Sequence, residues 1–176
     1  KSGLFTPSVL VSLQKVEDSY REVSAGTGGS LCAGALTPLR ALELSDAAPA
    51  VVRKTMKTLS NVRVRNVATI GGCLAHGDPH MDLPPVMTAL GASVTTVGPG
   101  GTRTINVEDL YEGYYETVLA SNELIATLEI PATAGVRAAY KKVTTRAADD
   151  WPALGVAVAI SGDGSNAAKA RIVVSA

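Results

Sequence analysis

Alternating apolar and polar positions run through much of the chain and predict a protein rich in β-strands. Val9, Val11 and Leu13, for example, alternate with residues that would face the opposite side of a strand. Strands are expected at residues 4–13 after a short turn, and at 22–24, 31–35, 92–97, 103–107, 123–130, 136–144, 153–160 and 170–175. The connecting turns are predicted at residues 26–30, 98–101, 106–110 and 161–166.

Three segments between these strands have the period of a helix. The first is expected to open at Thr37, its N-cap, just ahead of a proline. A second spans residues 49–59, where apolar residues recur at i, i+4 and i+7, and a third spans 82–90 before Gly91. The small, loop-like residues at 131–135 are the predicted domain boundary.

Composition and charge narrow the class of protein. The chain has 176 residues, 46% of them hydrophobic, enough for one domain with a sizeable core and part of another. Sixteen basic and sixteen acidic residues cancel, so neither a nucleic-acid stripe nor a polybasic membrane patch is expected. The longest apolar run, residues 152–160, is shorter than the roughly 20 residues that span a bilayer. Two cysteines are too few for a disulfide framework or an iron–sulfur cluster held by this chain alone, and a reducing cytoplasm is expected.

A glycine pair within residues 66–82 is the main candidate for a binding site. The stretch has no Lys or Arg, and Thr69 and Ile70 lead directly into Gly71 and Gly72. Because glycine lacks a Cβ, the pair can take positive φ and let a ligand approach the backbone closely. Exposed N–H groups in such a turn bind anions such as a diphosphate. The alternative is a tight turn between two buried elements.

The same stretch contains groups that ligate metals in other proteins. Cys73, His76, His80 and Asp82 lie close together in the sequence. A glycine and a proline between the histidines prevent the helical arrangement of a zinc motif, and no distant ligand pair matches Cys73. Metal binding is therefore not expected, and Asp82 could equally be an ordinary helix N-cap.

Several motifs in one order resemble a known family. They are Thr69-Ile70-Gly71-Gly72, then Pro79 and Asp82-Leu83, Gly113-Tyr114, residues 123–131, and Tyr140 followed by Lys142, Arg146 and Asp150. Together they resemble the flavoprotein subunit or domain of the molybdenum hydroxylases, which include xanthine dehydrogenase and aerobic carbon monoxide dehydrogenase. Asn usually follows the Gly-Gly pair in that family, and here Cys73 takes its place.

The resemblance implies an α+β fold, the FAD-binding domain of the PCMH or vanillyl-alcohol-oxidase type. Residues 1–131 would form its second subdomain, and residues 132–176 the start of a domain like the C-terminal domain of the carbon monoxide dehydrogenase flavoprotein. The family's first Gly-rich phosphate loop would lie ahead of Lys1. This chain by itself is therefore expected to bind FAD weakly and to self-associate through an unpaired sheet edge.

The resemblance also implies a set of FAD contacts. They are Thr69, Ile70, Gly71, Gly72, Cys73, Asp82, Leu59, Ile125 and Lys142. The Gly-Gly turn and Thr69 would hold the diphosphate, and Asp82 would meet sugar or ribityl hydroxyl groups. Leu59 and Ile125, which the apolar pattern places in the core, would pack on the flavin or adenine rings.

Two further residues have competing interpretations. Lys142 lies in an alternating stretch that predicts exposure to solvent, whereas the resemblance places it beside the isoalloxazine. A cation there would stabilise the anionic reduced flavin. Trp151 would either flank the ring or fill the core.

The function that the resemblance implies is electron transfer in a molybdenum hydroxylase. FAD would receive electrons from 2Fe-2S clusters fed by a molybdopterin cofactor, and would pass them to an external acceptor. The partners would be a molybdenum-cofactor large subunit and a 2Fe-2S small subunit, with no nucleic acid and no membrane insertion. No catalytic side chain is expected, because the redox chemistry belongs to the cofactor. The alternatives are an FAD-dependent reductase of the enolpyruvyl-UDP-sugar reductase type and a non-enzymatic scaffold without flavin.

Overall fold

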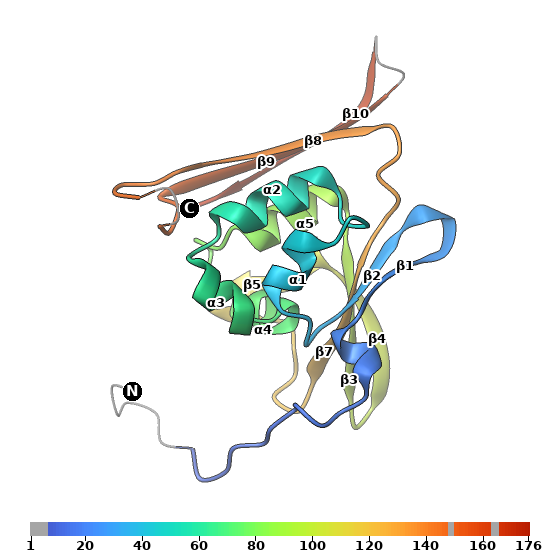
Figure 1. Cartoon of the computed structure of the whole chain (residues 1–176), viewed down its shortest axis with the longest axis vertical. Coiled ribbons are helices and arrows are strands. Elements are labelled where there is room, and N and C mark those ends of the chain that lie inside the picture. The colour runs from blue at the N-terminus through green and yellow to red at the C-terminus, as the bar shows by residue number, and fades with distance from the viewer. Residues whose placement is uncertain (1–6, 148–149, 163–165) are drawn as a thin grey trace.

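Two antiparallel sheets enclose a layer of helices in the computed structural model, which describes residues 7–147, 150–162 and 166–176 (Figure 1). The larger sheet has five strands in the order β1-β2-β7-β3-β4, and every neighbouring pair is antiparallel. Its strands are β1 (Val23–Ala25), β2 (Leu31–Gly34), β3 (Ser93–Gly98), β4 (Gly101–Asn106) and β7 (Leu124–Ile130).

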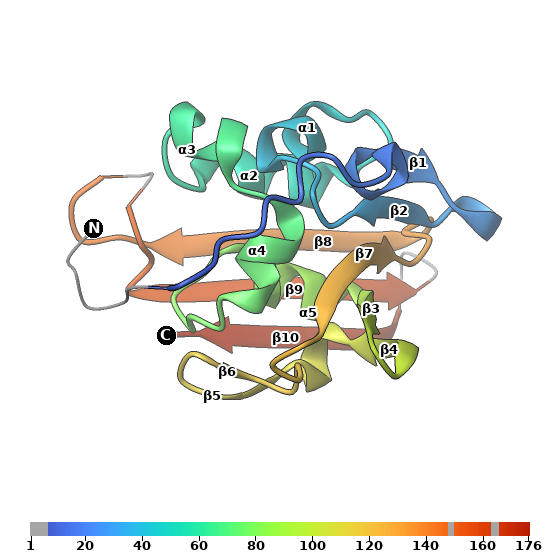
Figure 2. The ribbon, with the colours of Figure 1, turned by 90° about the horizontal axis from the view of Figure 1, so that it is seen from below.

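The second sheet has three strands in the order β10-β9-β8. They are β8 (Val136–Val143), β9 (Leu154–Gly162) and β10 (Ala167–Ser175). Seen from below, the three strands run side by side behind the helices (Figure 2). A short hairpin of β5 (Tyr111–Gly113) and β6 (Glu116–Thr117) lies outside both sheets.

Within the described residues, five α-helices separate the sheets. They are α1 (Leu39–Leu44), α2 (Ala50–Thr58), α3 (Val62–Val67), α4 (Ile70–Ala75) and α5 (Leu83–Leu90). Single 3-10 turns span Asp18–Arg21, Thr27–Gly29 and Val107–Asp109. Helix α5 packs against β9 and β10, α2 against β8, and α4 against β7, so the helical layer contacts both sheets.

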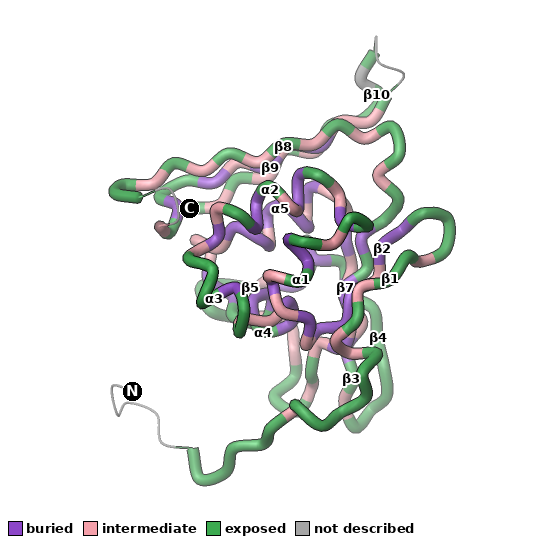
Figure 3. The backbone as a smooth tube through the Cα atoms, in the orientation of Figure 1, coloured by how far each residue is buried: buried purple, intermediate pink, exposed green. Residues whose placement is uncertain are grey.

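Most buried residues lie between the two sheets (Figure 3), and the buried apolar side chains there form one cluster. Its largest fully buried members include Leu39, Met56, Ile70, Leu83 and Leu128. Burying each such side chain stabilises the fold by roughly 1.5–3 kcal/mol. Ala157 and Ala159 of β9 belong to the same cluster, so the two sheets share a core. The boundary predicted at residues 131–135 lies in the connection between β7 and β8 and stays a prediction.

The predicted α+β class is confirmed, but the strand expected at residues 4–13 is wrong. Residues 7–13 form no strand, and residues 4–6 lie outside the part that the structure describes. Val9, Leu10 and Val11 are exposed on a segment that leaves the body of the molecule (Figure 1). Their alternation produces no strand because no described strand pairs with them.

The helical layer contains most of the other differences from the prediction. Helices α3 and α4 and the β5–β6 hairpin were not predicted, and the turn at 106–110 contains a 3-10 turn. The turn predicted at 161–166 includes residues 163–165, which lie outside the described residues. Thr37 is not the cap of α1: Pro38 occupies that position, while Thr37 is buried and its hydroxyl donates to the Glu22 carbonyl.

Candidate functional site

A cavity of about 460 Å³ opens beside the N-terminus of α4. One wall consists of the turn after α2, the side of α3, and the first residues of α4. The segment before α5 and the connection from β8 to β9 supply most of the rest of the lining. The lining residues are Leu39, Leu59, Ser60, Val64, Val67, Ala68, Thr69, Gly72, Cys73, His76, His80, Met81, Asp82, Trp151 and Pro152.

The N-terminus of α4 lies at this cavity, and Thr69 caps it. The Thr69 hydroxyl accepts a hydrogen bond from the Gly72 N–H at 3.2 Å. Both Gly71 and Gly72 have helical backbone, so the predicted turn with positive φ is wrong. Glycine is needed at position 71 for another reason: a Cβ there would lie 2.7 Å from the Cβ of Ala35. Gly72 is exposed, and a Cβ there would meet only the Thr69 hydroxyl, at 3.0 Å.

Most of the N–H groups at this helix end already have partners. The Ile70 N–H donates to the Thr37 carbonyl at 3.0 Å, and the Gly71 N–H donates to the Ala35 carbonyl at 2.8 Å. These bonds anchor α4 to the segment that follows β2. The Gly72 N–H donates to the Thr69 hydroxyl and the Cys73 N–H to the Thr69 carbonyl, so the predicted concavity of free N–H groups is wrong. Thr69 and Gly72 nevertheless both line the cavity.

A buried polar network centres on Asp82, which lines the cavity. Asp82 accepts hydrogen bonds from the Tyr140 hydroxyl at 2.8 Å and from Lys142 Nζ at 3.3 Å. Burial raises the pKa of the Asp82 carboxyl, while Tyr140 and Lys142 oppose that rise. Burial and the nearby Asp82 charge also raise the pKa of the Tyr140 phenol, so this group remains a donor.

Asp82 does not cap α5, although it stands at the N-cap position. Its side chain makes no capping hydrogen bond. A cap side chain accepts from the second or third helical N–H, and Pro84 and Pro85 occupy those positions without an N–H to give. The carboxylate therefore points into the network with Tyr140 and Lys142, and Asp82 is one of the lining residues of the cavity.

Lys142 joins three segments around the cavity. Its side chain is only 6% exposed, so the exposure predicted from the alternating pattern is wrong. Besides Asp82, its ammonium donates to the Thr58 carbonyl at 2.7 Å and the Asp150 carbonyl at 2.9 Å. The bond to the Asp150 carbonyl holds the connection that carries Trp151, a residue that is 59% exposed and lines the cavity. Trp151 therefore does not fill the core.

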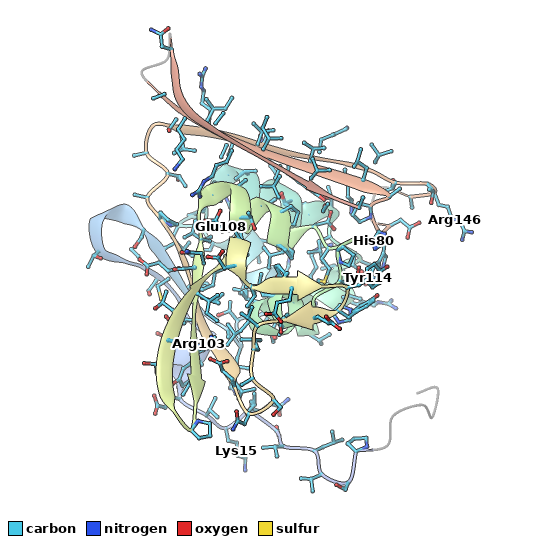
Figure 4. All side chains as sticks on the ribbon, turned by 180° about the vertical axis from the view of Figure 1, so that it is seen from behind. Lys15, His80, Arg103, Glu108, Tyr114 and Arg146 are labelled. Carbon is cyan, nitrogen blue, oxygen red and sulfur yellow. The ribbon has the colours of Figure 1, made fainter. Side chains whose placement is uncertain are left out.

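Beside the cavity, a buried carboxylate holds the connection between α4 and α5. Asp78 accepts hydrogen bonds from the Tyr115 hydroxyl at 2.7 Å, the His80 N–H at 2.8 Å and His80 Nδ1 at 3.1 Å. Burial alone would raise the pKa of Asp78, but these hydrogen bonds lower it. The His80 and Tyr114 rings meet edge to face, and Figure 4 shows both at the same side of the molecule. His76 and His80 thus lie in the connection between α4 and α5, and both line the cavity.

The described residues contain no group of three or more side chains arranged to hold a metal ion. Cys73 lies in the cavity wall, where burial and the charge of Asp82 raise the pKa of its thiol. Its sulfur therefore stays protonated and is a poor nucleophile and a poor metal ligand. Among the described residues, no helix is long and apolar enough to cross a membrane.

The structure brings most of the predicted contacts together. Five of them line the cavity: Leu59, Thr69, Gly72, Cys73 and Asp82. Ile70 and Gly71 lie buried behind the wall, and Lys142 contacts Asp82 from outside it. Ile125 lies half-buried on β7 and does not line the cavity, so its contact with FAD stays a prediction.

Sequence reasoning assigned no function to several residues of this site. Ser60 and Met81 line the cavity without a motif that would indicate it. Val64 and Val67 also line it; they lie in the stretch that leads into the Gly-Gly pair, but no individual role was assigned to them. Tyr140 could have been found, because it precedes Lys142 by two positions and so shares its face of the strand.

Known proteins resemble this chain over nearly its whole length. The family described as the FAD binding domain in molybdopterin dehydrogenase matches residues 1–133. The carbon monoxide dehydrogenase medium chain of Afipia carboxidovorans is 34% identical over 176 residues, covering 98% of this chain and 60% of that protein. The glyceraldehyde dehydrogenase medium chain of Sulfolobus acidocaldarius is 29% identical over 163 residues, covering 91% and 57%. The chain thus spans less than two thirds of the length of these relatives.

Solved structures give the same result for the fold. Quinoline 2-oxidoreductase from Pseudomonas putida superposes with a TM-score of 0.88 at 28% sequence identity, covering 98% of this chain and 60% of that one. A Cu,Mo-CO dehydrogenase superposes with a TM-score of 0.87 at 32% identity and the same coverage.

Proposed function

This chain belongs to the family of FAD binding domains in molybdopterin dehydrogenases, and we propose that it holds FAD in the cavity beside α4 as the electron-transfer component of a molybdenum hydroxylase. One observation carries the location of the site. Residues of three separate segments, each implied by the resemblance, line one cavity: Leu59; Thr69 with Gly72 and Cys73; and Asp82. Nothing in their sequence spacing alone requires that they meet.

The cavity suits one end of a flavin nucleotide. Its volume of about 460 Å³ lies within the range of roughly 300–1,000 Å³ that is usual for small-molecule sites. Its walls are largely apolar, with Leu59, Val64, Met81 and Trp151 available to pack on a flat ring. The missing side chain of Gly72 leaves space at the exposed start of α4, where a ligand can approach the backbone.

We assign separate roles to the polar groups. The Thr69 hydroxyl, which accepts from the Gly72 N–H, would donate to a phosphate oxygen, helped by the positive end of α4. Asp82 would accept hydrogen bonds from sugar or ribityl hydroxyls. Lys142 would position this carboxylate and would not itself donate to FAD, because its ammonium already donates to Asp82 and two backbone carbonyls. Bound FAD supplies the redox centre, and these residues orient it and limit the access of water.

The electron path is part of the same proposal. Electrons would arrive from 2Fe-2S clusters of a partner, fed by a molybdopterin cofactor on another subunit, and leave to an external acceptor. The relatives support this assignment because those named above are medium chains of dehydrogenases. A cytoplasmic location agrees with two free cysteines, Cys32 and Cys73.

Two matched substitutions test the location of the site in the full-length protein. Val67 and Leu44 are each the last residue of a six-residue helix and are 77% and 62% exposed, but only Val67 lines the cavity. Val67→Glu places a charge and added bulk at the cavity, so FAD binding should weaken at least tenfold, or by about 1.4 kcal/mol. Leu44→Glu should leave it unchanged. Equilibrium dialysis against FAD measures both, and equal affinities for the two variants would contradict the proposed site.

A further inference from the structure

The turn that ends α2 is held by two cationic side chains. The carbonyl of Thr58 accepts a hydrogen bond from Lys142 Nζ at 2.7 Å. The carbonyls of Leu59 and Ser60 both accept from Arg65 Nη1, the first at 3.1 Å. The end of an α-helix leaves such carbonyls without helical partners. Leu59 and Ser60 line the cavity, so these bonds act directly on its wall.

Arg65 is itself held from behind by Glu43. Its Nε donates to Glu43 Oε2 at 2.9 Å, and the two side chains are only 9% and 3% exposed. The other oxygen of Glu43 accepts from Arg40. Burial alone would raise the pKa of Glu43, but the bonds from Arg40 and Arg65 lower it, so the carboxylate stays charged. A fixed carboxylate gives the planar guanidinium one orientation, with Nη1 aimed at the turn.

Ser60 shows why the turn needs such support. Its φ is 51°, in the left-handed region that is costly for residues with a Cβ. Directly after it, Asn61 caps α3 by accepting from the N–H groups of Arg63 and Val64. The turn therefore has only the residues between Thr58 and Val62 in which to connect the end of α2 to the capped start of α3. The bonds from Arg65 to the Leu59 and Ser60 carbonyls stabilise it in this conformation.

We propose that Arg65, oriented by Glu43, is a positioning residue that sets the cavity wall at Leu59 and Ser60 and so determines how tightly FAD binds. Arg65 does not line the cavity and would act only through this wall. The inference rests on the proposed function of the cavity, and it adds a residue that contacts neither the cofactor nor the network of Asp82.

Arg103 provides a matched comparison. It also binds one carboxylate, Glu123, at 2.6 Å and one backbone carbonyl, that of Val118, at 2.8 Å. It lies on β4, well apart from His80, which lines the cavity (Figure 4). Removing either arginine breaks an ion pair and a bond to the backbone, but only Arg65 supports the cavity wall.

The test compares Arg65→Gln and Arg103→Gln in the full-length protein. FAD affinity is measured by equilibrium dialysis, and backbone mobility by hydrogen exchange of residues 57–62 in the absence of FAD. Arg65→Gln should bind FAD about tenfold more weakly, equivalent to about 1.4 kcal/mol, and should exchange faster in this segment. Arg103→Gln should match the wild type in both. Glu43→Gln keeps the guanidinium but loosens it, so a smaller change in the same direction is expected even if Arg65→Gln fails to fold.

Two results would overturn the role of Arg65: wild-type FAD affinity in folded Arg65→Gln, or an equal loss of affinity in Arg103→Gln. A wild-type protein that binds no FAD would instead refute the proposed function. Hydrogen exchange at residues 57–62 needs no FAD. Whether or not the protein binds FAD, this measurement therefore shows whether Arg65 stabilises the turn at Leu59 and Ser60.

Discussion

Replacing Gly71 or Gly72 by alanine should have different effects: the first should lower the stability of the fold, and the second should weaken FAD binding. The two residues are neighbours in α4 but face different surroundings. A Cβ on Gly71 would lie 2.7 Å from the Cβ of Ala35 and 3.1 Å from its carbonyl oxygen. Neither atom can move aside without a backbone shift. A Cβ on Gly72 would meet only the Thr69 hydroxyl, at 3.0 Å, on the exposed side that faces the cavity.

The geometry gives the size of each effect. Overpacking of a close-packed contact costs roughly 1–3 kcal/mol, which we expect for Gly71→Ala. For Gly72→Ala, the Thr69 cap could be weakened by about 1 kcal/mol. Replacing glycine within a helix contributes roughly 0.5–1 kcal/mol in the opposite direction. The net change in the free energy of unfolding for Gly72→Ala should therefore be close to zero.

Urea denaturation and FAD titration of the full-length protein measure both quantities. Gly71→Ala should lose stability. Gly72→Ala should keep its stability but bind FAD at least tenfold more weakly, and the larger Gly72→Val should lose binding. A folded Gly72→Val protein that retains FAD would refute the phosphate role of this position. Unchanged stability of Gly71→Ala would refute the packing argument.

Two further predictions concern the charged pairs. Lys142→Met leaves the Asp82 carboxylate buried without its cation, so the free energy of unfolding should fall by roughly 3–5 kcal/mol, and the double variant with Asp82→Asn should recover part of it. Any FAD that Lys142→Met retains should have a lower midpoint potential in a redox titration, since a cation near the reduced flavin is lost; an unchanged or raised potential would count against this role. Glu123 has its pKa lowered from 4.5 to about 2 by hydrogen bonds from Arg103 and Thr96, so its stabilising contribution is complete above pH 4.5 and is lost as the pH falls towards 2. Glu123→Gln should flatten the pH dependence of stability in that window, and identical curves for variant and wild type would contradict the assignment.

The sequence predicted the strands better than the short helices, for a physical reason. An antiparallel strand with one face on a core carries an alternating pattern of its own, and β7 and β9 were expected nearly where they lie. Helices α3 and α4 have six residues each, too few for a period to be recognised. They are stabilised by the caps Asn61 and Thr69 and by packing, which is not visible in a short stretch of sequence.

Five of the predicted contacts line one cavity, but the sequence did not predict the local geometry of these residues. The Gly-Gly pair was interpreted as a turn, because glycine favours positive φ, whereas the reason for Gly71 is its distance to Ala35, a tertiary contact. Lys142 was expected in solvent, although two consecutive lysines in a strand must point to opposite faces. One of Lys141 and Lys142 therefore had to face the helices, and a motif that includes Tyr140 could have indicated which.

The two prolines after Asp82 also affect how cavity occupancy is linked to folding. A carboxylate that caps a helix must give up a backbone hydrogen bond before it can bind a ligand, and the helix end then loses about 1 kcal/mol. Asp82 has no such bond to break, because Pro84 and Pro85 offer no N–H. Its bonds to Tyr140 and Lys142 use two of the roughly four acceptor positions of a carboxylate. A ligand hydroxyl can therefore bind to Asp82 or leave it without altering the stability of α5, so the helix stays equally well formed with the cavity filled or empty.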